Sequence, residues 1–408
     1  MFDKKVITRT IWLLSLVSLF NDIASEVVIP VMPVFLKSIG FSFFLIGVLE
    51  GLAEAVAGIS KGYFGNLSDH WGRRLPFVQF GYALSAIAKS SLAFVSTVVP
   101  VFLSRVGDKI GKGVRTSARD AMLSDASPPG KKATVFGFHR GMDTVGAVIG
   151  PSLALVYLYY HPANYQSLFA ITLIPGIIAV GITFLVKEKK LQRSGTAKKQ
   201  PGFFSFLSYW KESSRPYKII VTGLLFFTVM NSSDAFLLLT IKNKGYSDQY
   251  MIGIYIFYNL VFALLSYPVG KLTDRLGMMK TIIASLVVFS AVYYVIGFAE
   301  SLVVFMAIFT AYAIYAAGFD STTKAFITEH CKREQTGTAL GFYNGCASLL
   351  AILASSWTGF VWTHFTPQTA FIVSASGVLL VVIYFLFNNK YLSPHLKQKL
   401  ATDSQISF

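Results

Sequence analysis

The sequence contains few of the residues on which soluble folds and enzymes commonly depend. Of its 408 residues only two are cysteines, and Asp, Glu, Lys and Arg together make up 14%. Cys331 and Cys346 have no companion ligand residues nearby, so the sequence indicates neither a disulfide framework nor a metal site. No Ser-His-Asp set, HExxH sequence or nucleotide-binding loop is present, and the six histidines are scattered. We therefore expect a protein that is not an enzyme and that needs no metal or cofactor.

Apolar residues, in contrast, are abundant and fall in long blocks. They make up 54% of the chain, and the mean hydropathy is +0.57. Such values are typical of an integral membrane protein, and many of the blocks are as long as the roughly 20 residues that a helix needs to cross a bilayer. The pattern predicts twelve membrane-spanning helices, at residues 10–36, 42–64, 75–96, 98–121, 133–158, 165–186, 217–241, 250–271, 278–298, 301–327, 335–362 and 368–388.

Basic residues lie in short segments between the predicted spans. Because the net charge of +16 is divided among these segments, membrane topology explains it better than nucleic-acid binding does. The loops at residues 96–100 and 161–166 contain no Lys or Arg. The positive-inside rule therefore predicts cytoplasmic termini, with Lys242 and Lys244 in a predicted outer loop as an exception. The basic segments contain Lys4, Lys5, Arg9, Arg73, Arg74, Lys131 and Lys132.

The longest basic segment divides the chain into two predicted domains. Residues 187–216 form a predicted cytoplasmic linker between a six-helix bundle at residues 1–186 and a second bundle at residues 217–390. A cytoplasmic tail is predicted at residues 391–408. The aromatic run at residues 203–210 predicts either a short amphipathic helix in the membrane interface or an apolar turn packed on the bundle.

A short motif occurs twice, about half the chain apart. Residues 65–74 (GNLSDHWGRR) recur in degenerate form as residues 270–277 (GKLTDRLG), with Gly, Asp and Gly at the same spacing and an offset of 205 residues. A second pair, at residues 137–141 and 341–345, has an offset of 204 residues. Repetition that stays in register over this length indicates one half-unit used twice.

Twelve spans, a central basic loop and the motif Gly-x-x-x-Asp-x-x-Gly-Arg-Arg after the second span resemble the major facilitator superfamily of secondary transporters over essentially the whole chain. The resemblance implies an all-α integral membrane fold of two pseudo-symmetric six-helix bundles with cytoplasmic N- and C-termini. In that family the first glycine of the motif allows close helix approach. The aspartate and the arginines form a cytoplasmic charge cluster that holds the outward-open state.

The resemblance assigns a conformational latch to this motif. A carboxylate beside two cations at a helix end is stable only while the facing helix is near, which suits a latch. The second copy has Met278 and Met279 in place of the two arginines. The predicted latch residues are Gly65, Asp69, Gly72, Arg73, Arg74 and Asp274, together with Arg140 and Asp143 of the fifth span, which we assign to the latch or to packing.

Two shorter matches resemble the drug and proton antiporter branch of the same superfamily. Residues 146–151 (GAVIGP) match its Gly-x-x-x-Gly-Pro signature, and residues 30–33 (PVMP) match the Pro-x-x-Pro that closes its first span. The glycine pair that follows in the branch is replaced here near Ala154 and Leu155. Small residues four apart also mediate ordinary helix packing, which is the alternative interpretation.

Several carboxylates fall inside predicted spans, where an unpaired charge costs about 2.5–3.5 kcal/mol. Asp22 and Glu26 lie one turn apart in the first span, and Glu50 and Glu54 have the same spacing in the second. All four are candidates for proton coupling, with fixed ion pairing between helices as the alternative. Lys89 in the third span is predicted to pair with Glu50 or Glu54.

The fourth span carries cations at helical spacing. Arg105, Lys109 and Lys112 share one face, and the resembled fold places the first, fourth, seventh and tenth spans around a central cavity. We therefore predict that these cations bind substrate. Intramembrane asparagines can also contact substrate or hydrogen-bond helices together. Most aromatic residues of the second half, chiefly tyrosines, are expected to face lipid or the membrane interface, and some to line the cavity and stack on substrate. Further substrate-binding candidates are Asp234, Asn231, Asn259 and Asn344.

Together these features predict a proton-coupled secondary transporter of a bacterial-type inner membrane that works by alternating access. The cations favour a small anionic or zwitterionic organic solute, such as a carboxylate, a phosphorylated metabolite or a citrate-like chelator. We expect a monomer in the lipid bilayer that binds this solute and protons, uses the proton gradient and binds no nucleic acid. The alternatives are a drug and proton antiporter that exports amphiphilic compounds, and a receptor on the same fold without flux.

Overall fold

The computed structural model describes residues 3, 5–29, 31–95, 97–188 and 200–392, and this part of the chain is helical with no β-strand. The first half contains α1 (Arg9–Val28), α2 (Met32–Ser38), α3 (Phe43–Trp71), α4 (Leu75–Ser91), η1 (Leu92–Phe94), α5 (Val98–Ala126), α6 (Lys132–Tyr160), α7 (Tyr165–Ile171) and α8 (Leu173–Thr183). The second half contains η2 (Ser205–Ser208), α9 (Tyr209–Glu212), α10 (Arg215–Met230), α11 (Asp234–Asn243), α12 (Asp248–Leu276), α13 (Met278–Ile296), α14 (Leu302–Glu329), η3 (Arg333–Gln335), α15 (Thr336–His364) and α16 (Pro367–Leu392).

Every predicted span coincides with one helix or with two helices in succession. Four spans consist of two helices, namely α1 and α2, α4 and η1, α7 and α8, and α10 and α11. The last break occurs because Asn231 ends α10 and Ser233 caps α11 by accepting a hydrogen bond from the N–H of Ala235 (3.3 Å). Nine segments of the described residues are long and apolar enough to cross a membrane, namely α1, α6, α7 with α8, α10 with α11, and α12 to α16. Membrane passage of α3, α4 and α5 stays a prediction.

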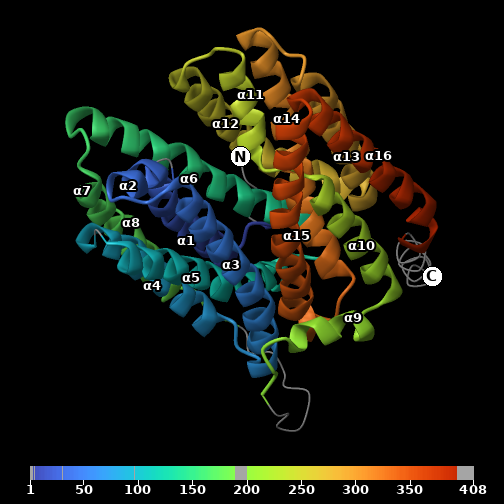
Figure 1. Cartoon of the computed structure of the whole chain (residues 1–408). Helices are drawn as coiled ribbons and strands as arrows, with labels where there is room; N and C mark the ends of the chain where they lie inside the picture. Colours follow the sequence, from blue (N-terminus) through green and yellow to red (C-terminus); the bar gives the residue numbers. More distant parts are fainter. Residues whose placement is uncertain (1–2, 4, 30, 96, 189–199, 393–408) are drawn as a thin grey trace, which may run out of the picture.

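The two halves contact each other through the repeated motif. Figure 1 shows α3 beside α15 and α6 beside α12. At Gly65 of α3 a Cβ atom would collide with the carbonyl oxygen of Gly337 in α15, and at Gly270 of α12 with that of Ala133 in α6. Residues 337 and 133 are 204 apart, so the two contacts are related by the internal repeat. Glycine is needed at both positions because no side chain fits between the backbones.

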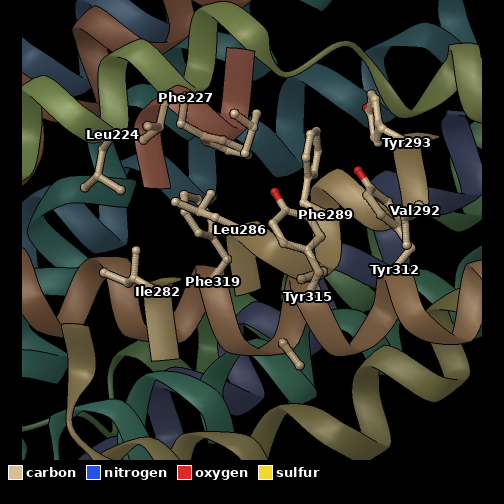
Figure 2. Close-up of a cluster of buried hydrophobic side chains, with 14 of the residues drawn as sticks. Leu224, Phe227, Ile282, Leu286, Phe289, Val292, Tyr293, Tyr312, Tyr315 and Phe319 are labelled. Atoms are coloured by element: carbon tan, nitrogen blue, oxygen red, sulfur yellow. The ribbon is translucent and has the colours of Figure 1, made fainter. Parts of the chain in front are cut away.

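Aromatic side chains form much of the core of the second half. Figure 2 shows them pointing toward one another from α10, α13 and α14, and the rings of Phe289 and Tyr293 stack with their centroids 4.0 Å apart. The expectation that most tyrosines of this half face lipid is wrong for these core positions, although Trp357, 54% exposed, lies at the surface. Buried tyrosines of this cluster include Tyr258, Tyr293, Tyr312 and Tyr315.

The aromatic part of the linker packs on both halves. Phe206 of η2 is buried against Gly62 of α3, and Trp210 of α9 stacks on Phe342 of α15 at 5.7 Å between centroids. These contacts favour the second of the two predictions, an apolar turn packed on the bundle. The rest of the predicted linker from residue 189 to residue 199, and the tail from residue 393, lie outside the described residues.

Gly65→Val should push α3 away from α15 and destabilise the protein. Overpacking of this kind costs about 1–3 kcal/mol, because the new side chain meets the backbone of Gly337 rather than a flexible side chain. The measurement is the midpoint of thermal unfolding in detergent. Gly181→Val in α8 is the matched control, since no atom lies within 4 Å of a Cβ built there. Equal midpoints for the two variants would contradict the proposed role of the close approach.

Candidate functional site

Each copy of the repeated motif ends its helix at a glycine with positive φ. Gly72 after α3 has a φ of 62°, and Gly277 after α12 has a φ of 100°. Residues with a Cβ atom adopt such backbone angles only with strain, which explains the second glycine of the motif. The N–H of Gly72 donates to the carbonyl oxygen of Asp69 (3.1 Å). This turn places the motif aspartate at the very end of the helix.

Both motif aspartates bind the N-terminus of a helix in the opposite half. The carboxylate of Asp69 accepts hydrogen bonds from the N–H (2.6 Å) and the hydroxyl (2.9 Å) of Thr338 in α15. Asp274 accepts from the N–H groups of Ala133 (3.1 Å) and Thr134 (2.9 Å) in α6, and from the hydroxyl of Thr134. First-turn N–H groups have no partner in their own helix and lie at the positive end of its dipole. The second copy therefore makes the contact without arginines.

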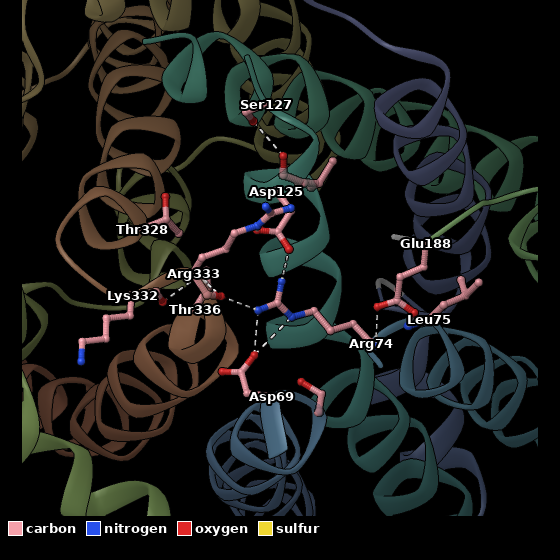
Figure 3. A network of polar contacts seen from close by, with 12 residues as sticks. Asp69, Arg74, Leu75, Asp125, Ser127, Glu188, Thr328, Lys332, Arg333 and Thr336 are labelled. Atoms are coloured by element: carbon pink, nitrogen blue, oxygen red, sulfur yellow. Dashed lines mark hydrogen bonds and ion pairs between the residues drawn. The ribbon is translucent and has the colours of Figure 1, made fainter. Parts of the chain in front are cut away.

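Arg74 connects the first motif to both halves, as Figure 3 shows. Its guanidinium is fully buried and donates to Asp69 (2.8 Å), to Asp125 of α5 and to the carbonyl oxygen of Arg333 (3.0 Å). Arg333, just before α15, also donates from its Nε to Asp125 (3.1 Å). We call Asp69, Arg74, Asp125 and Arg333 the motif cluster. A charged set that draws members from both halves is complete only while the halves touch.

A cavity of about 320 Å³ lies beside the motif cluster, between the two halves. The thiol of Cys331 borders it, and burial raises the pKa of this thiol to about 11. The thiol is therefore protonated at neutral pH and should react slowly until this end of the molecule opens. The lining residues are Ser124, Asp125 and Lys132 of the first half, and Thr328, Glu329, Cys331, Arg333 and Thr336 of the second.

Two carboxylates of α3 are paired with two cations of α5. Glu50 accepts a hydrogen bond from Arg105 (2.7 Å), and Glu54 accepts one from Lys109 (2.6 Å). Both pairs are separated by 55 residues, because the two helices run in the same direction and repeat their facing positions every turn. The structure thus brings predicted proton-coupling and substrate-binding residues together as ion pairs.

Lys89 of α4 does not pair with the carboxylates of α3, so that prediction is wrong. Its ammonium lies 3.6 Å from Asp108 of α5 and donates to Asn21 (3.1 Å) and Ser25 (2.7 Å) of α1. The physical reason is the helix arrangement, since α4 packs against α5 and α1. A buried lysine pairs with the acceptors that its neighbouring helices provide.

Lys112, Asp22 and Glu26 are predicted site residues that form no ion pair with any described residue. Lys112 of α5 is exposed, and its ammonium makes no hydrogen bond or ion pair with any described residue. Asp22 of α1 accepts a hydrogen bond from Asn21 (3.1 Å), and Glu26 has a buried Oε2 with no hydrogen-bond partner among the described residues. The Lys112 ammonium attracts both carboxylates electrostatically, which indicates that the three groups face the same interior.

The glycines of the fifth predicted span pack against these carboxylates. A Cβ atom at Gly146 of α6 would lie 2.9 Å from the Cβ of Asp22, and one at Gly150 would lie 2.7 Å from the Cβ of Glu26. Pro151 follows inside α6. The segment that resembles the antiporter signature therefore lets α6 approach α1 at the positions of Asp22 and Glu26, and its packing role fixes where the carboxylates lie.

The polar candidates of the second half differ in what satisfies them. Asp234 at the start of α11 accepts a hydrogen bond from the hydroxyl of Tyr312 (2.6 Å). The side-chain oxygen of Asn231 accepts one from the hydroxyl of Tyr293 (3.4 Å). Asn259 donates to a carbonyl oxygen of its own helix (3.0 Å). The Nδ2 of Asn344 is buried without a hydrogen-bond partner among the described residues. Of the three asparagines, Asn344 thus has the most unused capacity for a ligand.

Two ion pairs that the sequence analysis did not predict join the halves through α14. Nε of Arg140 in α6 lies 3.0 Å from Oδ2 of Asp320, and Nζ of Lys324 lies 2.9 Å from Oδ2 of Asp120 in α5. Arg140 also lies 3.6 Å from Asp143, so both residues belong to this interior set rather than to the motif cluster. Their position about two turns into α6 separates them from its motif-bound N-terminus. The available sequence signal was the pair of charges Asp320 and Lys324, one turn apart within the tenth predicted span.

Two repeated helical halves that are held together by matching motifs are an architecture typical of membrane transport proteins. The family model of the Major Facilitator Superfamily matches residues 14–261 and 251–404. An MFS-type transporter of Methanocaldococcus jannaschii is 27% identical over 394 residues, which cover 93% of this chain and 96% of that protein. The chain belongs to the Major Facilitator Superfamily, and the predicted family is thereby confirmed.

Other similar proteins match over part of the chain or in fold alone. The quinolone resistance protein NorA of Staphylococcus aureus is 25% identical over 224 residues, 54% of this chain and 56% of that protein. The structure of the human organic anion transporter MFSD10 (TETRAN) has a TM-score of 0.78 at 16% identity, covering 92% of this chain and 99% of that one. The transporter FucP in an outward conformation has a TM-score of 0.69 at 16% identity, covering 92% and 98%.

Arg74→Gln should loosen the contact between the halves, whereas Arg73→Gln should not. Arg74 is buried among its acceptors, whereas Arg73 is exposed and makes no ion pair with any described residue. Of the two predicted arginines, the motif cluster therefore contains Arg74 alone. Removing one partner of a buried charged set costs about 3–5 kcal/mol. In protein carrying Cys346→Ser, we expect Cys331 to be alkylated several-fold faster with Arg74→Gln. Equal rates for the two arginine variants would show that Arg74 does not hold this end closed.

Proposed function

We propose that the protein is a secondary active transporter that moves a small anionic or zwitterionic organic solute by alternating access. The observation that carries this proposal is the exposed ammonium of Lys112 on α5, which has no partner among the described residues. A free charge at membrane depth costs about 2.5–3.5 kcal/mol, and an anionic ligand would offset this cost. Arg105 and Lys109, on the same face, are neutralised by Glu50 and Glu54, which leaves Lys112 as the first anion-binding group.

Proton coupling is assigned first to Glu26 and second to Asp22. An ionised carboxylate without a partner carries the same cost as a free cation, and binding a proton removes it. Both carboxylates lie where Gly146 and Gly150 hold α6 against α1, so a change in this packing alters their surroundings directly. Glu50 and Glu54 are slower alternatives, because a proton reaches them only when their ion pairs open. The proton gradient is the proposed driving force.

The motif end of the molecule is assigned to the cytoplasm. Arg73 and Lys131 lie there, beside the contacts of α3 with α15 and of α6 with α12, and the positive-inside rule favours this side. Toward the opposite end, Gly51 of α3 and Gly253 of α12 have no atom within 4 Å of an added Cβ, which fits helices that have separated. The conformation is therefore assigned as outward-open, with the motif cluster as its latch.

Similar proteins support the assignment by analogy. The organic anion transporter among them is named for anionic substrates, and a solved fucose transporter is described as a proton symporter. Both share the fold with this chain at 16% identity, so they support the substrate class and the coupling ion without specifying the solute. We propose a bacterial-type inner membrane as its location and a monomer as its functional form.

Lys112→Gln should weaken anion binding about tenfold or more, because a charge in a poorly hydrated site attracts an anion strongly. The measurement is calorimetric titration of purified protein with fumarate, citrate and glucose 6-phosphate. Lys244→Gln is the matched control, since this lysine lies far from α5 beside Glu300 (3.9 Å). If none of the three anions binds the unmodified protein, or if Lys112→Gln binds them equally well, the proposed substrate class is wrong.

Glu26→Gln and Asp22→Asn should each uncouple transport from the proton gradient. An amide cannot bind and release a proton, so exchange of solute in counterflow should continue while accumulation driven by a pH gradient is lost. Both activities are measured in proteoliposomes. Full gradient-driven accumulation by both variants would show that neither carboxylate couples the proton.

A drug and proton antiporter is the second candidate, favoured by the partial match to the quinolone resistance protein and by the Gly146–Gly150 segment. The buried tyrosine cluster around Asp234 would then bind amphiphilic cations through ring faces and one carboxylate. Asp234→Asn should in that case abolish protection of cells against ethidium and quinolones. If deleting the gene leaves sensitivity to these compounds unchanged, the antiporter assignment fails.

A further inference from the structure

Helix α14 carries two charges that both bind the opposite half. Asp320 contacts Arg140 of α6 at 3.0 Å, and Lys324 contacts Asp120 of α5 at 2.9 Å. The internal repeat places Arg115 and Arg119 of α5 at the equivalent positions, and these bond to Ser85 and Asp120 within their own half. The two charges of α14 therefore hold the halves together in a way that the repeat does not reproduce.

The two pairs differ in how easily a solute could replace one partner. Asp120 is fully buried and also binds Arg119, so Lys324 and Asp120 form a structural contact. The side chains of Arg140 and Asp320 are 39% and 40% exposed. Neither Nε of Arg140 nor Oδ2 of Asp120 has a hydrogen bond of acceptable geometry among the described residues, so exposure is what distinguishes the two pairs. A half-exposed pair with an imperfect bond is one that a better-fitting anion can open.

Arg140 has the chemistry and the position of an anion receptor. A guanidinium presents five N–H donors in a planar fork that matches a carboxylate or phosphate, and here its carboxylate contacts are the single-atom approach of Asp320 and Asp143 at 3.6 Å. Its charge acts on Asp22 and Glu26, as does that of Lys112. The two cations therefore face the same interior, one from α6 and the other from α5.

We infer that Arg140 is a second anion-binding residue of the transport site and that Asp320 is its exchangeable counter-ion, so that an anionic solute and the carboxylate of Asp320 compete for one guanidinium. This inference rests on the proposed function and deepens it. In the solute-free state Asp320 neutralises Arg140 across the two halves. In the loaded state the solute takes that place, and the carboxylate of Asp320 needs another means of neutralisation.

A proton supplies that neutralisation, and this fixes the direction of coupling. The exchange converts an Arg140–Asp320 ion pair, a free anion and a proton into an Arg140–anion pair and a protonated Asp320, with charge balanced on both sides. This proton is additional to the one assigned to Glu26 or Asp22. Anion binding is therefore accompanied by proton uptake, and solute and proton move in the same direction, as a symport. The titratable or charged groups around Asp320 are Arg140 and Asp143 of α6, Asp120 of α5 through Lys324, Tyr315 and Lys324 of α14, Asp234 of α11, Tyr258 of α12 and Tyr343 of α15.

The same exchange links solute binding to movement of the halves. Once Asp320 has lost Arg140, one of the ion pairs that link α14 to the first half is gone, while Lys324 still contacts Asp120 and Lys132 still donates to the carbonyl oxygen of Thr328. A loaded and protonated transporter is therefore held less tightly than an empty one. The intact Arg140–Asp320 pair therefore makes movement of the two halves harder in the solute-free, deprotonated protein.

The test measures binding of fumarate, a dicarboxylate that stays doubly ionised from mildly acidic to mildly alkaline pH. For the unmodified protein we expect tighter binding at the lower pH. At the higher pH, Asp320→Asn should bind fumarate about fivefold more tightly than the unmodified protein, because an ion pair of this exposure contributes about that factor. The affinity of this variant should no longer depend on pH. Arg140→Gln should bind about fivefold or more weakly at both pH values. Glu300→Gln, which removes an exposed pair with Lys244, is the control.

Two outcomes separate this inference from the proposed function. If fumarate binds in a manner that depends on Lys112, while Asp320→Asn and Arg140→Gln both leave its affinity and pH dependence unchanged, the inference is overturned and the proposed function stands. If neither the unmodified protein nor Asp320→Asn binds fumarate, while counterflow of a neutral or cationic solute is found, both fail.

The double variant Arg140→Asp with Asp320→Arg restores the cross-link, and should recover thermal stability without recovering fumarate affinity. Full recovery of affinity would also contradict an Arg140 receptor.

Discussion

An ion without a partner is costly inside a membrane, and this constraint organises the interior of the protein. At membrane depth an unpaired charge costs about 2.5–3.5 kcal/mol on insertion scales. Glu50, Glu54 and Lys89 are each held by a residue of α5 for this reason. Against that background the ammonium of Lys112 and the carboxylate oxygen Oε2 of Glu26 are exceptions, because neither has a partner in the part of the chain that the structure describes. This uncompensated cost is the physical basis of the roles proposed for these two groups.

The same constraint applies to the backbone at the ends of the helices. The first-turn N–H groups of α6 and α15 have no partner in their own helices, and each set receives a carboxylate from the other half. Neither half therefore satisfies its polar groups alone while this end is closed. At the membrane surface water can replace these carboxylates when the halves separate, which keeps the cost of opening moderate. The contacts of these carboxylates with the N-termini of α6 and α15 can thus stabilise the closed arrangement of this end and still be replaced by contacts with water.

Local patterns predicted the fold well and the pairings poorly. The spans and the repeat follow from hydropathy and spacing, which a linear sequence contains, whereas the latch role of Asp69 is what the family resemblance implies. The partners of Lys89 and Arg140 depend on which helices are neighbours and how far each is shifted along the other, and local spacing does not contain this information. The common separation of 55 residues in the two pairs between α3 and α5 could have been found by aligning the two helices turn by turn. Burial of the second-half tyrosines depends similarly on tertiary packing.

The internal repeat gives α5 and α14 the same place in their halves but unlike charges. Arg115 and Arg119 bond within the first half, whereas Asp320 and Lys324 bond across to it. Movement of the second half must therefore change the charge balance of the first, because it withdraws an anion from one site and a cation from another. Two halves with identical, self-contained charges could rock without any such change. In the proposed mechanism the duplicated scaffold permits the motion, and the difference between its two copies links that motion to the charge of the bound solute.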